Sequence, residues 1–549
     1  MALASRSIET RSRFDWRRSL AFAAALALLN ASLTFENFWP TPAIVWRGQV
    51  SIELAVVLLA AAIGWRVLGA PTRRMVNGLS ALWLALVLGR YADVTAPALY
   101  GRDINLYWDV RYASDVTAML TRAAPWGLIV LVGLAALVLL VALFLLIRWA
   151  IRTVATGLEQ DGQRTAAAAL AAAALLWFAA QAASVRVSAV PAFSRPVTAT
   201  YARQARLMME ARAAKNGARV LAPSPAMNSD FTLVAQTDVF LIFIESYGAI
   251  TYDRPDFARR LTASRERLLS AVRDTDRDVV STFVASPTFG GSSWLAHISL
   301  MSGIEVRDPD TDALLMTQQR DTLAKAFARA GHHTVAWMPG LKQAWPEGVF
   351  YGFDEIDGAR KVDYHGPEFG WFAIPDQFSL ARLDQIMAER SGRTPYFVFF
   401  PTLSTHTPFS PKPPYDEDWA RVLTREPFDP GEVDKANDEE IDWLNLSPNY
   451  VAAVEYANIV LAGYLRLHRD RDFVLILMGD HQPPALVSGA GASWDVPVHV
   501  IASRSTARAE VLNRLRAHGF QTGLTPRRAP LGPMHTLLPI LLDALGSRH

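Results

Sequence analysis

Polar residues with possible catalytic roles follow directly after apolar runs at three places in the second half of the chain. Glu245 ends the run "DVFLIFIE", His406 comes shortly after "YFVFFPT", and Asp480 and His481 follow "FVLILMG". Two carboxylates and an imidazole form a suitable ligand set for a divalent cation such as Zn²⁺, Mn²⁺ or Mg²⁺. Each residue alone could be a helix cap or part of a polar turn, so the predicted metal site depends on their meeting in space.

A fourth place offers a nucleophile. In "TFGGSSWLAHISLMSG", Ser292 and Ser293 lie between two glycines and an apparent helix. Glycines allow close backbone approach, and the N-terminus of a helix attracts anions. A serine in this position suits attack on a phosphate or sulfate ester, and a nearby metal ion would lower the pKa of its hydroxyl. Both serines are also good N-cap residues, which is the simpler interpretation.

These side chains can meet only if the apolar runs before them are strands of one sheet. Short β-rich runs alternate with helical stretches, which favours an α/β domain with a mainly parallel sheet. Ligands bind such sheets at the carboxyl ends of the strands, where the candidate residues lie. The predicted strands are 238–245, 279–286, 333–338, 396–402, 473–478 and 496–502.

The first third of the chain has a different pattern, with five long apolar stretches before residue 190. Several approach the ~20 residues that span a bilayer, and we predict an all-α transmembrane domain of about five helices. A cleaved signal peptide is the alternative interpretation of the first stretch. The stretches are 19–35, 51–69, 78–98, 126–147 and 165–185, and the predicted domains are 1–190 (transmembrane), 191–230 (connector) and 231–549 (extracytoplasmic, catalytic).

The distribution of arginine predicts the orientation in the membrane. With the N-terminus in the cytoplasm, ten arginines fall in inner segments and four in outer loops; positive charge favours the inner side. Five spans then place everything after residue 190 outside the cytoplasm, which predicts a membrane-anchored protein with a large extracytoplasmic domain. Arg90 and Asp93, three residues apart in the third stretch, can pair on one helix face. Such charges within a membrane are often functional, although a pair near the interface is the simpler explanation.

Composition excludes several classes of function. The 549 residues contain no cysteine, which excludes disulfides, thiolate metal sites and cysteine nucleophiles. The net charge is +2 and no nucleic-acid-binding motif is present, so we expect no nucleic-acid partner.

At the candidate residues the sequence resembles the membrane-bound branch of the alkaline phosphatase and sulfatase superfamily. This branch contains lipoteichoic acid synthases and other phosphoglycerol or phosphoethanolamine transferases, and the resemblance covers the apolar helices, the connector and the α/β domain. It implies one divalent metal ion (Mn, Zn or Mg) held by Glu245, Ser293, Asp480 and His481. It also implies that His406, in "STHTPF", contacts the substrate.

The resemblance extends to the nucleophile. Counting back ten residues from Gly303 in "LMSG" reaches Ser293, as in sulfatases. The spacing differs in lipoteichoic acid synthases, so Ser292 remains an alternative nucleophile. The residues after Ser293, "WLAHI", lack the proline and arginine of the formylglycine signature, which argues against a formylglycine sulfatase. His297, on the same helix face as Ser293, could contact the leaving group or pack against the turn.

Other residues match the family less completely. The segment "HHTVAWMPGLKQAWPEGVFYGFDEI" is similar to the part of the family that carries a substrate-contacting aromatic residue, which makes Trp345 a candidate. The relatives carry an arginine near the position of Pro346. Lys342 could replace its charge but not its bidentate geometry, which leaves the head group open. The resemblance also implies that Gly479 lets the chain turn after the strand, so that Asp480 and His481 reach the metal ion.

The activity implied by the resemblance is a two-step transfer from a phospholipid donor. Ser293 would attack the phosphorus of the lipid head group, diacylglycerol would leave, and a hydroxyl of an envelope glycan or lipid would accept the head group. His406 and the metal ion would stabilise the negative charge. A phosphodiester or sulfate ester hydrolase on the same scaffold, and a non-catalytic membrane scaffold, are the alternatives.

Overall fold

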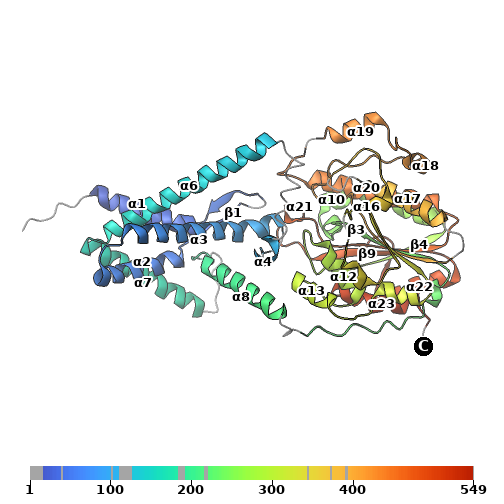
Figure 1. The fold of residues 1–549 in the computed structure, drawn as a ribbon, viewed down its shortest axis with the longest axis horizontal. Helices are drawn as coiled ribbons and strands as arrows, with labels where there is room; N and C mark the ends of the chain where they lie inside the picture. The colour runs from blue at the N-terminus through green and yellow to red at the C-terminus, as the bar shows by residue number, and fades with distance from the viewer. Residues whose placement is uncertain are drawn as a thin grey trace, which may run out of the picture. The chain divides into compact units, whose positions relative to one another are not determined.

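The structure is a computed structural model, and its contacts divide the chain into two compact units. The first comprises Met1–Ala96 and Ile104–Met208, and the second comprises Pro97–Asp103 and Met209–His549. The first unit is helical and the second is an α/β domain (Figure 1). The residues that the structure describes are 16–38, 41–100, 103–104, 106–110, 126–183, 192–215, 220–342, 345–370, 374–389, 394–439 and 441–547.

The helical unit has a long helix at each of the five predicted stretches, although residues 184 and 185 lie outside the described part. Three of these helices contain segments long and apolar enough to cross a membrane: Arg73–Leu99, Trp126–Gly157 and Asp161–Gln181. The spanning role of the other two remains a prediction. The five helices are α1 (Trp16–Thr34), α2 (Ile52–Leu68), α3 (Arg73–Tyr100), α6 (Trp126–Gly157) and α7 (Asp161–Ala183).

Arg90 and Asp93 on α3 have separate partners instead of the predicted pairing. The Arg90 guanidinium donates to the backbone oxygens of Phe35 at 2.8 Å and of Arg195 at 3.4 Å. Asp93 accepts from Arg203 at 3.1 Å. Arg203 lies on α8 (Val197–Lys215), so the two charges connect α3 to other parts of its own unit. Pairing of this kind lowers the cost of charges close to apolar surroundings.

The α/β unit is built on one eight-stranded sheet with the order β10-β4-β9-β8-β3-β7-β5-β6. Strands β8, β3, β7, β5 and β6 are parallel to one another, whereas β9 is antiparallel to both β8 and β4. Strand β4 therefore points the same way as β8, and the predicted mainly parallel sheet is confirmed. The strands are β3 (Asp238–Ile244), β4 (Arg277–Ala285), β5 (His333–Met338), β6 (Glu355–Gly358), β7 (Tyr396–Pro401), β8 (Phe473–Gly479), β9 (Asp495–Ser503) and β10 (Gln521–Thr522).

The predicted strands agree with the observed ones to within two residues at each end. Strands β6 and β10, and the hairpin of β1 (Phe35–Asn37) and β2 (Ile44–Trp46) in the helical unit, were not predicted. They are two to four residues long, too short for a periodic pattern to be visible.

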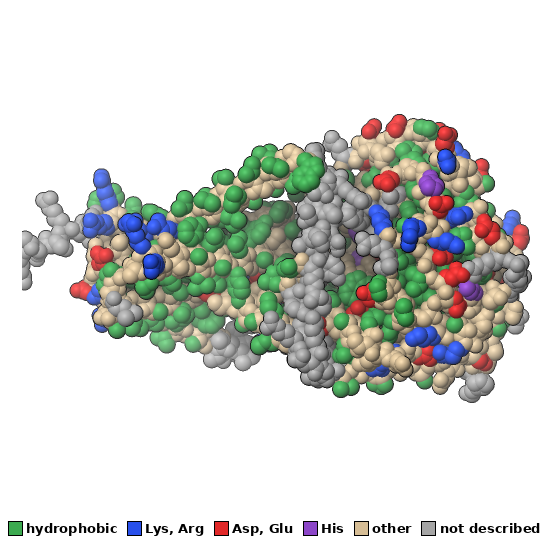
Figure 2. Space-filling model, in the orientation of Figure 1, with side chains coloured by type: hydrophobic (Ala, Val, Ile, Leu, Met, Phe, Trp, Pro, Cys, Tyr) green, Lys and Arg blue, Asp and Glu red, His purple; other side chains and the backbone are tan. Residues whose placement is uncertain are grey.

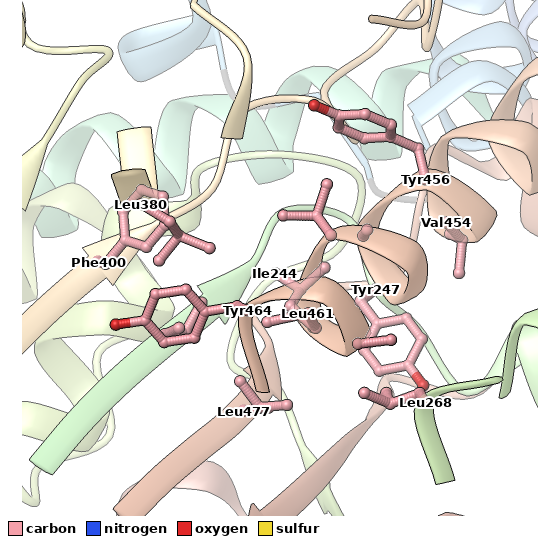
Figure 3. Packing of buried hydrophobic residues seen from close by; sticks show 14 of the residues in the cluster. Ile244, Tyr247, Leu268, Leu380, Phe400, Val454, Tyr456, Leu461, Tyr464 and Leu477 are labelled. Carbon is pink, nitrogen blue, oxygen red and sulfur yellow. The ribbon is translucent and has the colours of Figure 1, made fainter. Parts of the chain in front are cut away.

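Both faces of the sheet are buried, which explains why its strands are continuous apolar runs. On β3, Ile242 and Ile244 belong to one core and Leu241 and Phe243 to the other. The helices α11, α17 and α20 contribute to the first core, part of which Figure 3 shows, and α12, α14, α22 and α23 to the second (Figure 1). Their bounds are α11 (Thr262–Asp274), α12 (Ser293–Ser302), α14 (Leu323–Arg329), α17 (Asp376–Glu389), α20 (Ser447–Leu467), α22 (Thr506–Ala517) and α23 (Leu537–Leu545).

Shorter α-helices lie between these elements. They are α4 (Leu106–Asp109), α9 (Ile250–Asp253), α10 (Pro255–Arg260), α13 (Pro309–Met316), α15 (Gly348–Tyr351), α16 (Ala359–Val362), α18 (Trp419–Val422), α19 (Pro430–Asn437) and α21 (Ala485–Ser488).

Candidate active site

The carboxyl edge of the sheet brings together Glu245, Ser293, Asp480 and His481, which we call the carboxyl-edge cluster. The Ser293 hydroxyl donates to Glu245 Oε2 at 2.8 Å and lies 3.2 Å from His481 Nε2. His481 Nε2 lies 3.3 Å from Glu245 Oε1 and 3.8 Å from Asp480 Oδ2. One ligand atom from each of the two carboxylates and the imidazole lies within 4.8 Å of the others, a spacing that could hold a metal ion.

The register of two neighbouring strands produces this arrangement. Ile244 of β3 pairs with Gly479 of β8, so the next residues, Glu245 and Asp480, leave the sheet at the same level. Gly479 does not have a positive φ, so a turn that only glycine can adopt is not the reason for a glycine at this position. A Cβ added there would lie 1.8 Å from the backbone oxygen of Tyr247, so the glycine is required for close approach between the two chain segments.

A left-handed loop positions the serine. Gly290, Gly291 and Ser292 have φ values of 67°, 144° and 62°, and helix α12 begins at Ser293. A left-handed conformation costs a non-glycine residue such as Ser292 about 1–3 kcal/mol. The Gly290 N–H donates to the Gln482 backbone oxygen at 3.1 Å, which joins this loop to the chain just after the Asp–His pair. The Ser292 side chain makes no capping hydrogen bond.

The hydrogen bonding of Asp480 fits a bound cation. Its Oδ1 accepts from the backbone N–H groups of Ser246 at 2.8 Å and His481 at 2.7 Å. Its Oδ2 is buried and has no hydrogen-bond partner among the described residues, and the residue is only 1% exposed. An unpaired buried carboxylate oxygen is costly, and a divalent cation would compensate it.

The orientation of His481 is that of a metal ligand. Its Nδ1 lies 2.8 Å from the backbone oxygen of Gln482, to which it can only donate. The lone pair of the neutral ring is then on Nε2, the nitrogen that faces the cluster. A backbone carbonyl that fixes the tautomer in this way is the usual partner of metal-bound histidine.

The charges of the cluster are not balanced within it. Burial and the neighbouring Glu245 raise the pKa of Asp480 well above its ordinary value. Burial alone would lower the pKa of His481, but Asp480 and Glu245 raise it to about 9. Burial alone would raise the pKa of Glu245, yet His481 and His406 hold it below its ordinary value. Two buried carboxylates therefore compete for positive charge, which a divalent ion would supply.

His406 lies in the loop after β7, near enough to Glu245 to affect its pKa. Its Nδ1 lies 2.7 Å from the backbone oxygen of Thr407 and donates to it. This hydrogen bond orients the imidazole ring. The structure thus places the predicted substrate-contacting histidine close to the cluster.

Sequence reasoning missed Asp376, the first residue of α17, which organises the His406 loop. Its two carboxylate oxygens accept from the backbone N–H groups of Leu403 at 2.7 Å and Ser404 at 3.0 Å. Asp376 is 3% exposed, and burial raises its pKa to about 6. The Pro–Asp pair before an apolar run indicates a helix start, but contacts with residues 27 and 28 positions away leave no local signal.

His297 is packed in the protein interior. It is 7% exposed, and its ring centroid lies 4.5 Å from that of Phe243 and 5.2 Å from that of Phe399. Burial lowers its pKa to about 3. Of the two interpretations offered by the sequence, this geometry favours packing over contact with a leaving group.

Trp345 and Lys342 line a cavity of about 500 Å³ after β5, together with Leu341, Arg360 and Lys361. None of the cluster residues is among those that line it. The Trp345 ring packs against Tyr351 with centroids 5.1 Å apart. Their contact with substrate remains a prediction.

Comparison with known proteins agrees with the fold. Residues 307–523 match the family model described as Sulfatase, a segment that includes His406, Asp480 and His481. The predicted relation to the sulfatase superfamily is confirmed, and the second unit is a sulfatase-like α/β domain. No curated protein sequence matches the chain.

Several solved structures are similar at low identity. The lipoteichoic acid synthase LtaP from Listeria monocytogenes is 13% identical, covering 60% of this chain and 76% of its own, with a TM-score of 0.37. The lipooligosaccharide phosphoethanolamine transferase A from Neisseria meningitidis is 15% identical, covering 88% and 89%, with a TM-score of 0.47. The phosphoglycerol transferase GacH from Streptococcus pyogenes is 11% identical, covering 57% and 85%, with a TM-score of 0.33.

Proposed function

We propose that the sulfatase-like domain is a metal-dependent phosphotransferase anchored to the membrane. It moves a phospholipid head group, phosphoglycerol or phosphoethanolamine, through a phosphoryl-serine to a hydroxyl of an envelope glycan or lipid. The observation that carries the proposal is the Ser293 hydroxyl, which lies within hydrogen-bond distance of both Glu245 and His481 in a buried Glu–Asp–His group. The apolar helices support a lipid donor, because an anchored domain meets lipid at a high effective concentration.

The residues that would hold the divalent ion are Glu245, Ser293, Asp480 and His481. The ion would lower the pKa of the serine hydroxyl and neutralise charge on the phosphoryl oxygens. Zinc, manganese and magnesium are all compatible with oxygen and imidazole ligands.

In the first step Ser293 Oγ, which would lose its proton to solvent when the ion is bound, attacks as the alkoxide and forms a bond to phosphorus, and the bond from phosphorus to the diacylglycerol oxygen breaks. The leaving oxygen needs a proton. Because His406 Nδ1 already donates to Thr407, Nε2 of the protonated ring is the donor that we assign to this oxygen. His406 leaves this step as a neutral imidazole.

In the second step the acceptor hydroxyl attacks phosphorus, and the Ser293 oxygen leaves as the alkoxide with which the first step began. The proton of the acceptor passes to Nε2 of the neutral His406, which restores the protonated ring. Water in place of the acceptor would follow the same route and give a hydrolase. The reaction is therefore a transfer only where an acceptor hydroxyl replaces water in the site.

The experiment supplies purified full-length protein in liposomes with fluorescently tailed phosphatidylglycerol or phosphatidylethanolamine, together with Mn²⁺, Zn²⁺ or Mg²⁺. Diacylglycerol release is followed in the parent and in Ser293→Ala, Ser292→Ala and Glu245→Ala. We expect metal-dependent release from one lipid, lost in Ser293→Ala and Glu245→Ala and retained in Ser292→Ala. No release from either lipid by metal-loaded protein would refute the lipid donor, and release without transfer to any added acceptor would indicate a hydrolase.

A further inference from the structure

The helical unit has a small cavity lined by three arginines. Its volume is about 180 Å³, and it lies between α2, α3 and α6. Arg73 comes from the start of α3, Arg148 and Arg152 come from α6, and Trp65 comes from α2. Glu159 is the one carboxylate in its lining, so the lining residues carry a net positive charge.

All three arginines line the one cavity, and Arg73 and Arg152 are exposed. Arg148 is half-buried, and its Nε donates to Asn77 Oδ1 at 2.7 Å, which orients the guanidinium. Arg152 lies four residues further along α6, on the same face of the helix. Like charges at this spacing repel each other and destabilise a helix. An anion in the cavity would relieve this repulsion.

The surroundings of the cavity indicate the source of the anion. On α6, large apolar residues from Trp126 to Leu146 are exposed, and no residue of its most apolar segment is buried. A surface of this length and composition fits the hydrocarbon core of a bilayer. Figure 2 shows that Lys and Arg side chains gather at one end of this unit, next to the apolar surface. Trp65 in the cavity and the exposed Trp149 are amphipathic residues of the kind that lie at head-group depth.

We propose that this cavity binds the phosphate of an anionic phospholipid. The guanidinium groups of Arg73, Arg148 and Arg152 would contact the phosphate oxygens, for which their planar donors are well suited. The acyl chains would lie along the apolar face of α6. The N-terminus-in orientation predicted above would place this lipid in the cytoplasmic leaflet, where basic pockets between helices recognise anionic head groups. The proposal is independent of the function of the sulfatase-like domain.

The test uses full-length protein in detergent and measures retained lipid by native mass spectrometry. Phosphatidylglycerol and phosphatidylcholine are added separately, and glycerol phosphate and inorganic phosphate serve as soluble competitors. The double variant R73Q/R152Q removes two lining charges. Arg66, near the end of α2, and Arg74, near the start of α3, are exposed and do not line the cavity. The double variant R66Q/R74Q, which removes these two charges, is the matched control.

We expect preferential retention of phosphatidylglycerol over phosphatidylcholine, a loss of about tenfold or more in R73Q/R152Q, and retention by the control. An equal loss in both pairs would show a diffuse charge effect and overturn the proposal. Equal retention of the two lipids would also overturn the proposal. Displacement of the lipid by glycerol phosphate or inorganic phosphate at equal concentration would overturn it as well. If the double variant does not fold, Arg152→Gln is compared with Arg74→Gln in the same assay.

Discussion

The two ends of β3 and β8 carry clusters of similar residues with different properties. The carboxyl ends lead to Glu245, Asp480 and His481. At the opposite ends lie Asp238, the first residue of β3, and Arg471, two residues before β8. Together with Asp384 and His468 they form what we call the amino-edge cluster, and all four residues line a cavity of about 610 Å³.

In the amino-edge cluster the charges are paired. Arg471 contacts Asp238 at 2.6 Å and Asp384 at 3.0 Å, and His468 contacts Asp384 at 2.6 Å. The Tyr464 hydroxyl donates to Asp384 at 2.9 Å. By contrast, the carboxyl-edge cluster has no guanidinium, and Asp480 Oδ2 has no hydrogen-bond partner among the described residues. The comparison teaches that the two clusters differ in charge balance: the carboxylates of the amino-edge cluster share a guanidinium, whereas those of the carboxyl-edge cluster do not.

The largest effect should come from replacing Asp480 in the carboxyl-edge cluster, with Asp384 in the amino-edge cluster as the comparison. Asp480→Asn removes a proposed ligand charge, and we expect loss of bound metal and about a thousandfold slower diacylglycerol release. Asp384→Asn is the matched control, with metal content and activity per folded molecule retained. Metal analysis and the lipid assay measure both. If Asp480→Asn bound as much metal as the parent, the carboxyl-edge cluster would not differ from the amino-edge cluster in metal binding.

Replacing Arg471, the cation shared by Asp238 and Asp384, should affect the stability of the protein and leave its metal content and activity unchanged. Arg471→Met leaves Asp238 and Asp384 without their guanidinium partner. Because the side chain of Arg471 is 26% exposed, water partly compensates this loss. We expect the free energy of unfolding to fall by about 2–3 kcal/mol, measured by denaturant titration in detergent. A change in metal content would show that the two clusters are coupled.

A smaller effect is expected at the support of the His406 loop. In Asp376→Asn the amide nitrogen cannot accept a hydrogen bond, so either the Leu403 or the Ser404 N–H loses its partner. Displacement of His406 should lower kcat about tenfold and alter its pH dependence, with metal content unchanged. Steady-state kinetics from pH 5 to 9 test this. An unchanged pH profile together with lower stability would make Asp376 purely structural.

The smallest effect concerns His499 on β9, a buried histidine that belongs to neither cluster. Burial and Arg265 lower the pKa of His499 on β9 to about 3. A pKa below the unfolded value of about 6.5 means that its stabilising contribution is complete above pH 6.5 and declines as pH falls towards 3. The difference in unfolding free energy between the parent and His499→Gln should therefore shrink by about 1.4 kcal/mol per pH unit below 6.5. Unfolding titrations at pH 7, 6 and 5 measure it, and a constant difference would contradict the assignment.

The sequence by itself determined the six longer strands, the long apolar helices and the polar residues that directly follow three of the strands. Apolar runs of strand length gave six strands within two residues of their observed ends, because both faces of the sheet are buried and no polar alternation interrupts the pattern. Glu245, Asp480 and His481 were visible as candidates because they stand directly after such runs. The apolar helices were visible because their composition extends over whole spans.

Only the tertiary structure decided which of these residues meet and how they face one another. The pairing of β8 with β3 places Asp480 beside Glu245, and the left-handed loop before α12 brings the Ser293 hydroxyl to Glu245. The same packing buries the ring of His297 in contact with Phe243 and Phe399. These outcomes depend on strand pairing and side-chain packing between segments far apart in the chain. The free energies of these contacts are not visible in any local pattern of residues.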